Sequence, residues 1–66
     1  MMDYRNSEMI AVIDEVVHSE RDRKILKRRY IDGIVFETLA EEFDMSVRQI
    51  QNIVYRYQVK LFKHFV

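Results

Sequence analysis

The sequence predicts an all-α fold in which residues 1–66 form one compact domain of four helices. The chain contains one Gly and no Pro, the two residues that most often interrupt helices and build turns. Apolar residues make up 48% of the chain and recur at the three- and four-residue spacing of amphipathic helices. A chain of 66 residues is close to the lower limit for a core that stabilises itself, so we expect a single domain.

The first helix is expected over about residues 7–17, with Asn6 or Ser7 as the N-cap that accepts a hydrogen bond from the first turn. Its core face repeats at helical spacing and consists of Met9, Val12, Ile13, Val16 and Val17. Asp14 and Glu15 fall outside this face, so the outer side of the helix is acidic.

The second helix is expected over about residues 20–31, with Ser19 as its N-cap. Gly33 marks its end, because glycine adopts the left-handed conformation that closes many helices. Arg29 lies at the border of the core face, so we expect its stem to pack and its head to pair with an acid. The core face itself consists of Ile25, Leu26 and Tyr30.

A short third helix is expected over about residues 37–43 and a fourth over about residues 47–64. Ser46 and Gln49 have the spacing of a capping box, which marks the start of the fourth helix. Asp44 lies in the turn between them and tolerates the left-handed conformation at modest cost. The third helix contributes to the core Leu39, Ala40 and Phe43.

The fourth helix separates its side chains by face. Its core face consists of Ile50, Ile53, Val54, Tyr57 and Leu61. The opposite side begins with Arg48, Gln51, Asn52, Tyr55 and Arg56, and then continues into the apolar Val59, Phe62 and Val66. An apolar stripe on the outside of a small domain indicates a partner. Three alternatives are open: a helix-to-helix homodimer, contact with RNA polymerase or another regulator, and a frayed or refolded tail.

The net charge is zero, but the charges alternate along the chain. Residues 1–22 carry six acids and two Arg, and residues 23–31 carry five basic residues and no acid. Residues 32–45 carry five acids, and residues 46–66 carry four basic residues and no acid. If the two basic segments share one side of the fold, the molecule is electrostatically polar despite its zero total.

The segment from Phe36 to Ile53 follows the helix-turn-helix pattern: a short helix, a tight turn and a Ser-capped helix. Ala40 is small where the two helices would cross, and such a crossing directs the second helix into the major groove of DNA. Arg can bridge a guanine and Gln or Asn an adenine. The candidate DNA contacts are therefore Arg48, Gln51, Asn52 and Arg56, with a solvated polar face as the alternative. Tyr55 is either a further DNA contact or a partly exposed aromatic.

From about Ser19 to Leu61 the chain resembles the fourth region of bacterial sigma factors, and the small phage and prophage regulators that carry this region as a free-standing domain. The matching stretches are SERDRKIL, RRYIDG, TLAEEF and MSVRQIQNI, followed by Lys60-Leu61. The resemblance implies that the Ser-capped helix enters the major groove at a promoter element. It also implies that the basic helix before the Gly33 turn contacts the DNA backbone. It adds three candidates for contact with phosphates or a polymerase surface: Lys24, Lys27 and Arg28.

We therefore expect a sequence-specific transcriptional regulator that binds double-stranded DNA, as a homodimer, in the cytoplasm of a bacterial or phage-infected cell. The alternative is a protein-interaction module that binds RNA polymerase or a sigma factor and has little DNA affinity of its own. The sequence contains no metal-ligand set, nucleophile–base pair or Gly-rich phosphate loop, so we expect neither an enzyme nor a cofactor or metal. It contains no Cys, which suits a reducing cytoplasm. It contains no apolar run of the ~20 residues that span a bilayer, so we expect no membrane contact.

Overall fold

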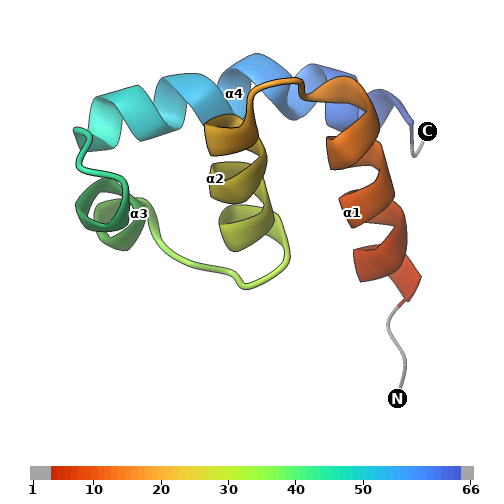
Figure 1. Cartoon of the computed structure of the whole chain (residues 1–66), viewed down its shortest axis with the longest axis horizontal. Coiled ribbons are helices and arrows are strands. Elements are labelled where there is room, and N and C mark those ends of the chain that lie inside the picture. The colour runs from red at the N-terminus through yellow and green to blue at the C-terminus, as the bar shows by residue number, and fades with distance from the viewer. Residues whose placement is uncertain (1–3, 65–66) are drawn as a thin grey trace.

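The computed structural model describes residues 4–64, which form four helices (Figure 1). They are α1 (Tyr4–Val16), α2 (Glu20–Tyr30), α3 (Phe36–Glu42) and α4 (Val47–Lys63). No strand occurs in this part of the chain, and the predicted all-α fold is confirmed. The last three helices begin and end within one residue of the predicted bounds.

The start of α1 was predicted wrongly. Asn6 and Ser7 do not cap the helix but lie inside it, because α1 begins at Tyr4. Neither residue excludes a helical backbone, and no Gly or Pro precedes them, so the helix extends past the polar pair.

Helix α4 extends across one side of the molecule and packs on each of the other three (Figure 1). Helices α1 and α2 run antiparallel beneath it, and α3 lies under its N-terminal end. In this view α3 is seen nearly end-on while α4 lies across the page, so their axes cross steeply. The C-terminal end of α4 and helix α1 share the opposite end of the molecule.

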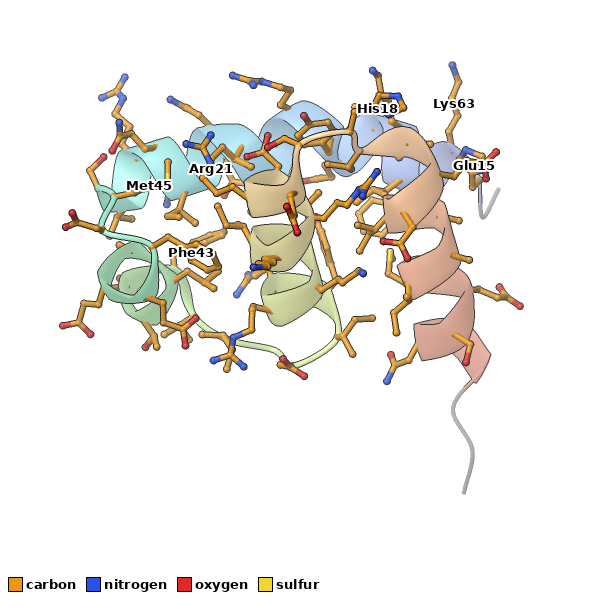
Figure 2. The ribbon with its side chains drawn as sticks, in the orientation of Figure 1. Glu15, His18, Arg21, Phe43, Met45 and Lys63 are labelled. Carbon is orange, nitrogen blue, oxygen red and sulfur yellow. The ribbon has the colours of Figure 1, made fainter. Side chains whose placement is uncertain are left out.

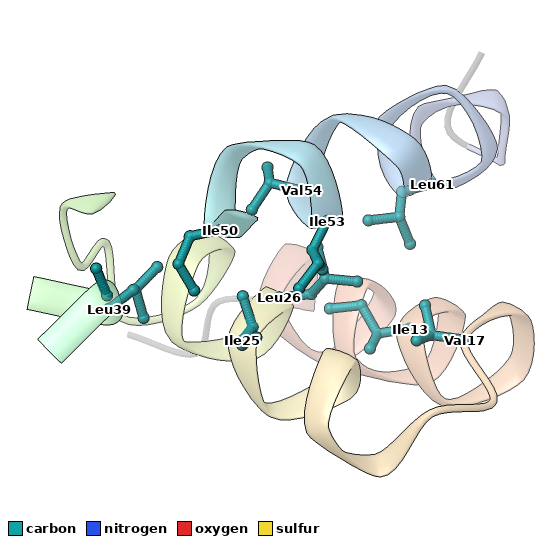
Figure 3. Close-up of a cluster of buried hydrophobic side chains, with 10 residues drawn as sticks. Ile13, Val17, Ile25, Leu26, Leu39, Ile50, Ile53, Val54 and Leu61 are labelled. Atoms are coloured by element: carbon teal, nitrogen blue, oxygen red, sulfur yellow. The ribbon is translucent and has the colours of Figure 1, made fainter. Parts of the chain in front are cut away.

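The core draws residues from every helix and lies beneath α4 (Figure 3). Ile25 and Leu26 of α2 are fully buried at its centre. Because α4 contributes more core residues than any other helix, its core face is fixed and its opposite side must face outward. The buried set consists of Ile13, Val17, Ile25, Leu26, Leu39, Ala40, Ile50, Ile53, Val54 and Leu61.

The turn that leads into α4 is closed by backbone and side-chain hydrogen bonds. Asp44 has a φ of 54°, and the Met45 N–H donates to the Ala40 carbonyl oxygen at 2.9 Å, which is one bond of a Schellman motif. The predicted capping box is present: the Gln49 N–H donates to Ser46 Oγ at 3.1 Å, and the Ser46 N–H donates to Gln49 Oε1 at 2.9 Å. The first turn of α4 is therefore held in place from both sides.

Ion pairs tie α2 to its two neighbours. Lys27 Nζ lies 2.8 Å from Asp14 Oδ1 of α1. On the other side, Arg28 forms a paired contact with Glu42 of α3, in which Nε donates to Oε1 at 3.1 Å and Nη2 donates to Oε2. Arg28 Nη1 also donates to Asp32 Oδ2 at 3.0 Å. Two side chains of the basic segment therefore have their charge balanced by carboxylates.

The expectation that Arg29 pairs with an acid is wrong. Its Nη1 donates to the Ile34 carbonyl oxygen at 3.1 Å, and its Cζ lies 4.2 Å from the centre of the Phe36 ring. A carbonyl and an aromatic face, both electron-rich, take the place of the carboxylate. This contact holds the segment between α2 and α3 against the start of α3.

Candidate nucleic-acid interface

The side of α4 that faces away from the core carries the predicted contact residues. Arg48, Asn52, Tyr55 and Arg56 are exposed, and Gln51 is half-buried. We call these five residues the α4 edge. Arg48, Asn52 and Arg56 are spaced four residues apart, so they form one row along the helix. The structure thus brings these five predicted residues together on one surface.

The α4 edge is cationic. Helix α4 contains two Arg and two Lys and no acid. Within residues 4–64, none of these four cations forms a salt bridge. Their charge is therefore not balanced by the acids of α1 and α3, in contrast to that of Lys27 and Arg28.

A shallow surface groove of about 220 Å³ runs beside the α4 edge. It lies between α4, the start of α2 and the turn before α4. Figure 2 shows Arg21 and Met45 on this side of the molecule. The groove is lined by Arg21, Met45, Gln49, Asn52, Ile53 and Arg56. Two guanidinium groups and two amides around an apolar patch form a surface suited to an anion such as a phosphate group.

Arg21 is held in place by a buried carboxylate. Its Nε and Nη2 each donate to Asp22 Oδ1 at 3.2 Å, and Tyr57 Oη donates to Asp22 Oδ2 at 3.1 Å. Asp22 is only 3% exposed, whereas the Arg21 side chain is 57% exposed. Burial, and then the hydrogen bond to Asp22, raise the pKa of the Tyr57 phenol, so it remains a donor at neutral pH. The arrangement orients an exposed guanidinium while two of its five donors are in use.

Arg21 was not among the residues predicted from the sequence. Its segment, Ser19 to Asp22, indicated a helix start, and that role is correct: Ser19 Oγ accepts a hydrogen bond from the Asp22 N–H. The sequence contained no signal for the approach of Arg21 to α4, because Asp22 and Tyr57 lie 35 positions apart along the chain.

The three residues that the family resemblance added have different surroundings. Lys24 is exposed on α2. Lys27 and Arg28 are half-buried and engaged by the carboxylates described above, and the paired contact with Glu42 raises the pKa of Arg28 further above its already high value. A phosphate would have to compete with these carboxylates. Only Lys24 of the three therefore presents an uncompensated charge within the described part of the chain.

Tyr55 lies at the border between the α4 edge and α3. Its ring packs edge-on against Phe36, with 6.1 Å between ring centres, and 54% of the residue is exposed. Its ring is therefore packed on one side and exposed on the other, and a DNA contact by Tyr55 stays a prediction.

The apolar residues farther along α4 are exposed as predicted. Val59 is 72% exposed, and Phe62 is 40% exposed while packing edge-on against Tyr30 at 5.6 Å between ring centres. We call these two residues the apolar pair. Val66, the third residue of the predicted partner surface, lies outside the described residues.

Among residues 4–64, no group of three or more His, Cys, Asp or Glu residues is placed to hold a metal ion. No helix in this range has the length and the run of apolar residues needed to cross a bilayer. Comparison of the chain with models of protein families, with curated proteins and with solved structures gave no match.

Proposed function

We propose that this chain is a sequence-specific regulator of transcription that binds double-stranded DNA in the cytoplasm through a helix-turn-helix like that of sigma factor region 4. One observation carries the proposal: α4 presents an outward row of Arg and amide side chains with no acid on the helix. A solvated helix face has no need to exclude acids, whereas a surface that meets phosphates does.

The α4 edge supplies the base contacts. A helix of ~10–12 Å diameter fits the major groove, which is ~12 Å wide. Arg48, Gln51 and Asn52 lie in the first turns of α4, where a helix that enters the groove by its N-terminus meets base edges. Their side chains offer the paired hydrogen bonds that distinguish guanine and adenine.

Arg21 supplies a phosphate contact beside α4, where it lines the surface groove. Arg21 is oriented before binding by Asp22, so less side-chain entropy is lost when it contacts DNA. Exposed acids on α3, Glu37 and Glu41, would repel phosphates on any other approach. Charge then sets the direction from which the domain docks on DNA, and contacts with base edges determine which DNA sequence it binds.

A homodimer supplies the additional contact area that one module lacks. A single module of this kind covers only ~600–1,000 Å². The apolar pair is available for contact between two copies. Two such modules would bind half-sites about one DNA turn apart, ~34–36 Å between centres.

The proposal is tested by selecting bound duplexes from a random DNA pool at fixed salt. We expect enrichment of one motif, present twice as a palindrome. The affinity for that motif should fall with salt with a log–log slope near −0.9 for each phosphate neutralised. Absence of any enriched motif would contradict the proposal.

Two matched variants locate the surface. Replacing Arg48 and Asn52 by Ala should weaken binding to the selected motif by about tenfold or more, since each paired base contact contributes ~1–3 kcal/mol. Gln58→Ala removes another exposed amide of α4, outside the edge, and should leave binding unchanged. Circular dichroism should show the same helix content for all three proteins.

The second candidate function is a protein-interaction module for RNA polymerase or a sigma factor. It is favoured by the apolar pair, because an exposed valine and phenylalanine one helical turn apart offer an apolar surface for a protein partner. This function predicts that no DNA motif is enriched and that Val59→Asp abolishes capture of purified RNA polymerase. Failure of the unchanged chain to capture either RNA polymerase or a sigma factor would exclude it.

A further inference from the structure

The exposed side of α4 near its C-terminal end repeats a pattern found on α1 with the opposite charge. On α4, Arg56, Val59 and Lys63 are spaced three and four residues apart and are all exposed. On α1, Glu8, Ala11 and Glu15 have the same spacing and are also exposed. Each set forms one stripe along its helix, with an apolar residue between two like charges.

We infer that two copies of this chain pair by placing the cationic stripe of α4 (Arg56, Val59, Lys63) against the acidic stripe of α1 (Glu8, Ala11, Glu15) of the second copy. In both stripes the charges stand seven residues apart, which is ~10.5 Å along a helix axis. Opposite charges therefore meet whichever way the two helices run. This pairing specifies the homodimer proposed above and requires no DNA.

Charge disfavours the simpler pairing of α4 with α4. Because the charged residues in the last turns of α4 are all basic, an antiparallel pair centred near Val59 would set Arg56 of one copy against Lys63 of the other, twice. Like charges held opposite each other at an interface weaken it. On α1, by contrast, every charged residue among the described side chains 6–16 is acidic.

The apolar residues of the two surfaces also correspond. Val59 is 72% exposed at the centre of the α4 stripe, and Ala11 is exposed at the centre of the α1 stripe. A small residue on one helix lets a larger residue from the other approach closely. Contact between these two residues would cover Val59, which the monomer leaves in water.

The positions of the two stripes suit a closed dimer. Glu15 and Lys63 lie at the same end of the molecule (Figure 2), and no ion pair joins them within the described part of the chain. Two copies that meet at this end can exchange both contacts, α4 on α1 and α1 on α4, about one two-fold axis. Arg48 and Asn52 lie toward the other end of α4 and stay available for DNA, whereas Arg56 is engaged by the second copy in the dimer.

The experiment uses two charge-reversed chains, measured by sedimentation in low salt without DNA. One carries Arg56→Glu and Lys63→Glu, and the other carries Glu8→Arg and Glu15→Lys. A homodimer of either variant places like charges at both contacts. We therefore expect its dissociation constant to be about tenfold or more above that of the unchanged chain. Mixed in equal amounts, they restore opposite charges at both contacts and should form a heterodimer.

Circular dichroism first confirms that both reversed chains are folded. Retention of the homodimer by both of them, with loss of it in Val59→Asp, would assign the contact to apolar pairing of α4 with itself and overturn the inference. An unchanged chain that stays monomeric at every concentration would also overturn it. Because no DNA is present, neither result bears on recognition by Arg48 and Asn52, which the duplex selection tests separately.

Discussion

Asp22 shows how a single buried charge can serve the surface of a small protein. It lies in the first turn of α2 and accepts hydrogen bonds from Arg21 at Oδ1 and from Tyr57 of α4 at Oδ2, so neither buried oxygen lacks a partner. A buried carboxylate is costly unless it is paired and hydrogen-bonded. Here those bonds join two helices and orient the guanidinium beside the α4 edge.

Removing the Tyr57 hydroxyl should therefore destabilise the fold. Tyr57→Phe takes one hydrogen bond from a buried carboxylate, and we expect the free energy of unfolding to fall by about 1–3 kcal/mol in urea titrations. Tyr55→Phe is the matched control, because the Tyr55 hydroxyl forms no hydrogen bond within the described residues. Equal stability of the two variants would show that the Asp22 contact contributes little.

At the scale of the elements, α2 is the helix that the other helices are fastened to. Lys27 ties it to α1, Arg28 to α3 and Asp22 to α4. Lys27 and Arg28, which the family resemblance made candidates for contact with phosphates or a polymerase surface, thus act in the structure as ties between helices. A run of basic residues on a helix can therefore form ion pairs with acidic neighbouring helices and does not by itself indicate a DNA contact.

The tie between α2 and α3 should make stability depend on pH in the acid range. The hydrogen bonds from Arg28 lower the pKa of Glu42 below its ordinary value of 4.5. A lowered carboxyl pKa adds stability above the unfolded value, and this stability is lost as the pH falls through the folded value. We expect the unchanged chain to melt at a higher temperature than Glu42→Gln at neutral pH.

This difference should shrink as the pH falls below 4.5 and through the lowered pKa of Glu42. Glu37→Gln serves as the control, because Glu37 lies on the same helix and forms no salt bridge within the described residues. A gap between the melting curves that stays constant across this pH range would show that the Glu42 carboxylate is not the group responsible.

At the scale of the whole molecule, the limiting feature is the small core. A domain of 66 residues is expected to be stable by only ~3–10 kcal/mol, from ~0.05–0.15 kcal/mol per residue. Helix α4 contributes the most residues to the core and is also the candidate DNA-contacting element. Core packing therefore directly determines how the α4 edge is presented.

Leu26→Ala should remove a large part of this stability. Leu26 is fully buried, and such a truncation costs ~2–5 kcal/mol, so we expect a strongly lowered melting temperature or a partly unfolded chain at 25 °C. Val35→Ala shortens a residue that is 54% exposed and should shift the melting temperature little. A Leu26→Ala protein as stable as Val35→Ala would indicate a larger source of stability than this core.

The sequence by itself determined the helices. The spacing of apolar residues gave the core face of α4, and local signals fixed helix ends. The Ser46–Gln49 box marks the start of α4, and two left-handed residues, Gly33 with a φ of 70° and Asp44, follow the ends of α2 and α3. Such signals depend on hydrogen bonds within a few residues, so they can be recognised without a fold. The start of α1 was misplaced, because the two polar residues expected to cap it, Asn6 and Ser7, lie inside the helix.

Only the tertiary structure decided what the charged side chains do. Whether Arg28 is free for a phosphate depends on Glu42, which lies 14 positions away, and whether Arg21 stands beside α4 depends on Tyr57 and Asp22. Long, flexible cations take their partners from whatever the fold brings within reach, and helical periodicity does not record those distances. The sequence therefore indicated which face of α4 is exposed, while the packing of α2 selected which cations share it.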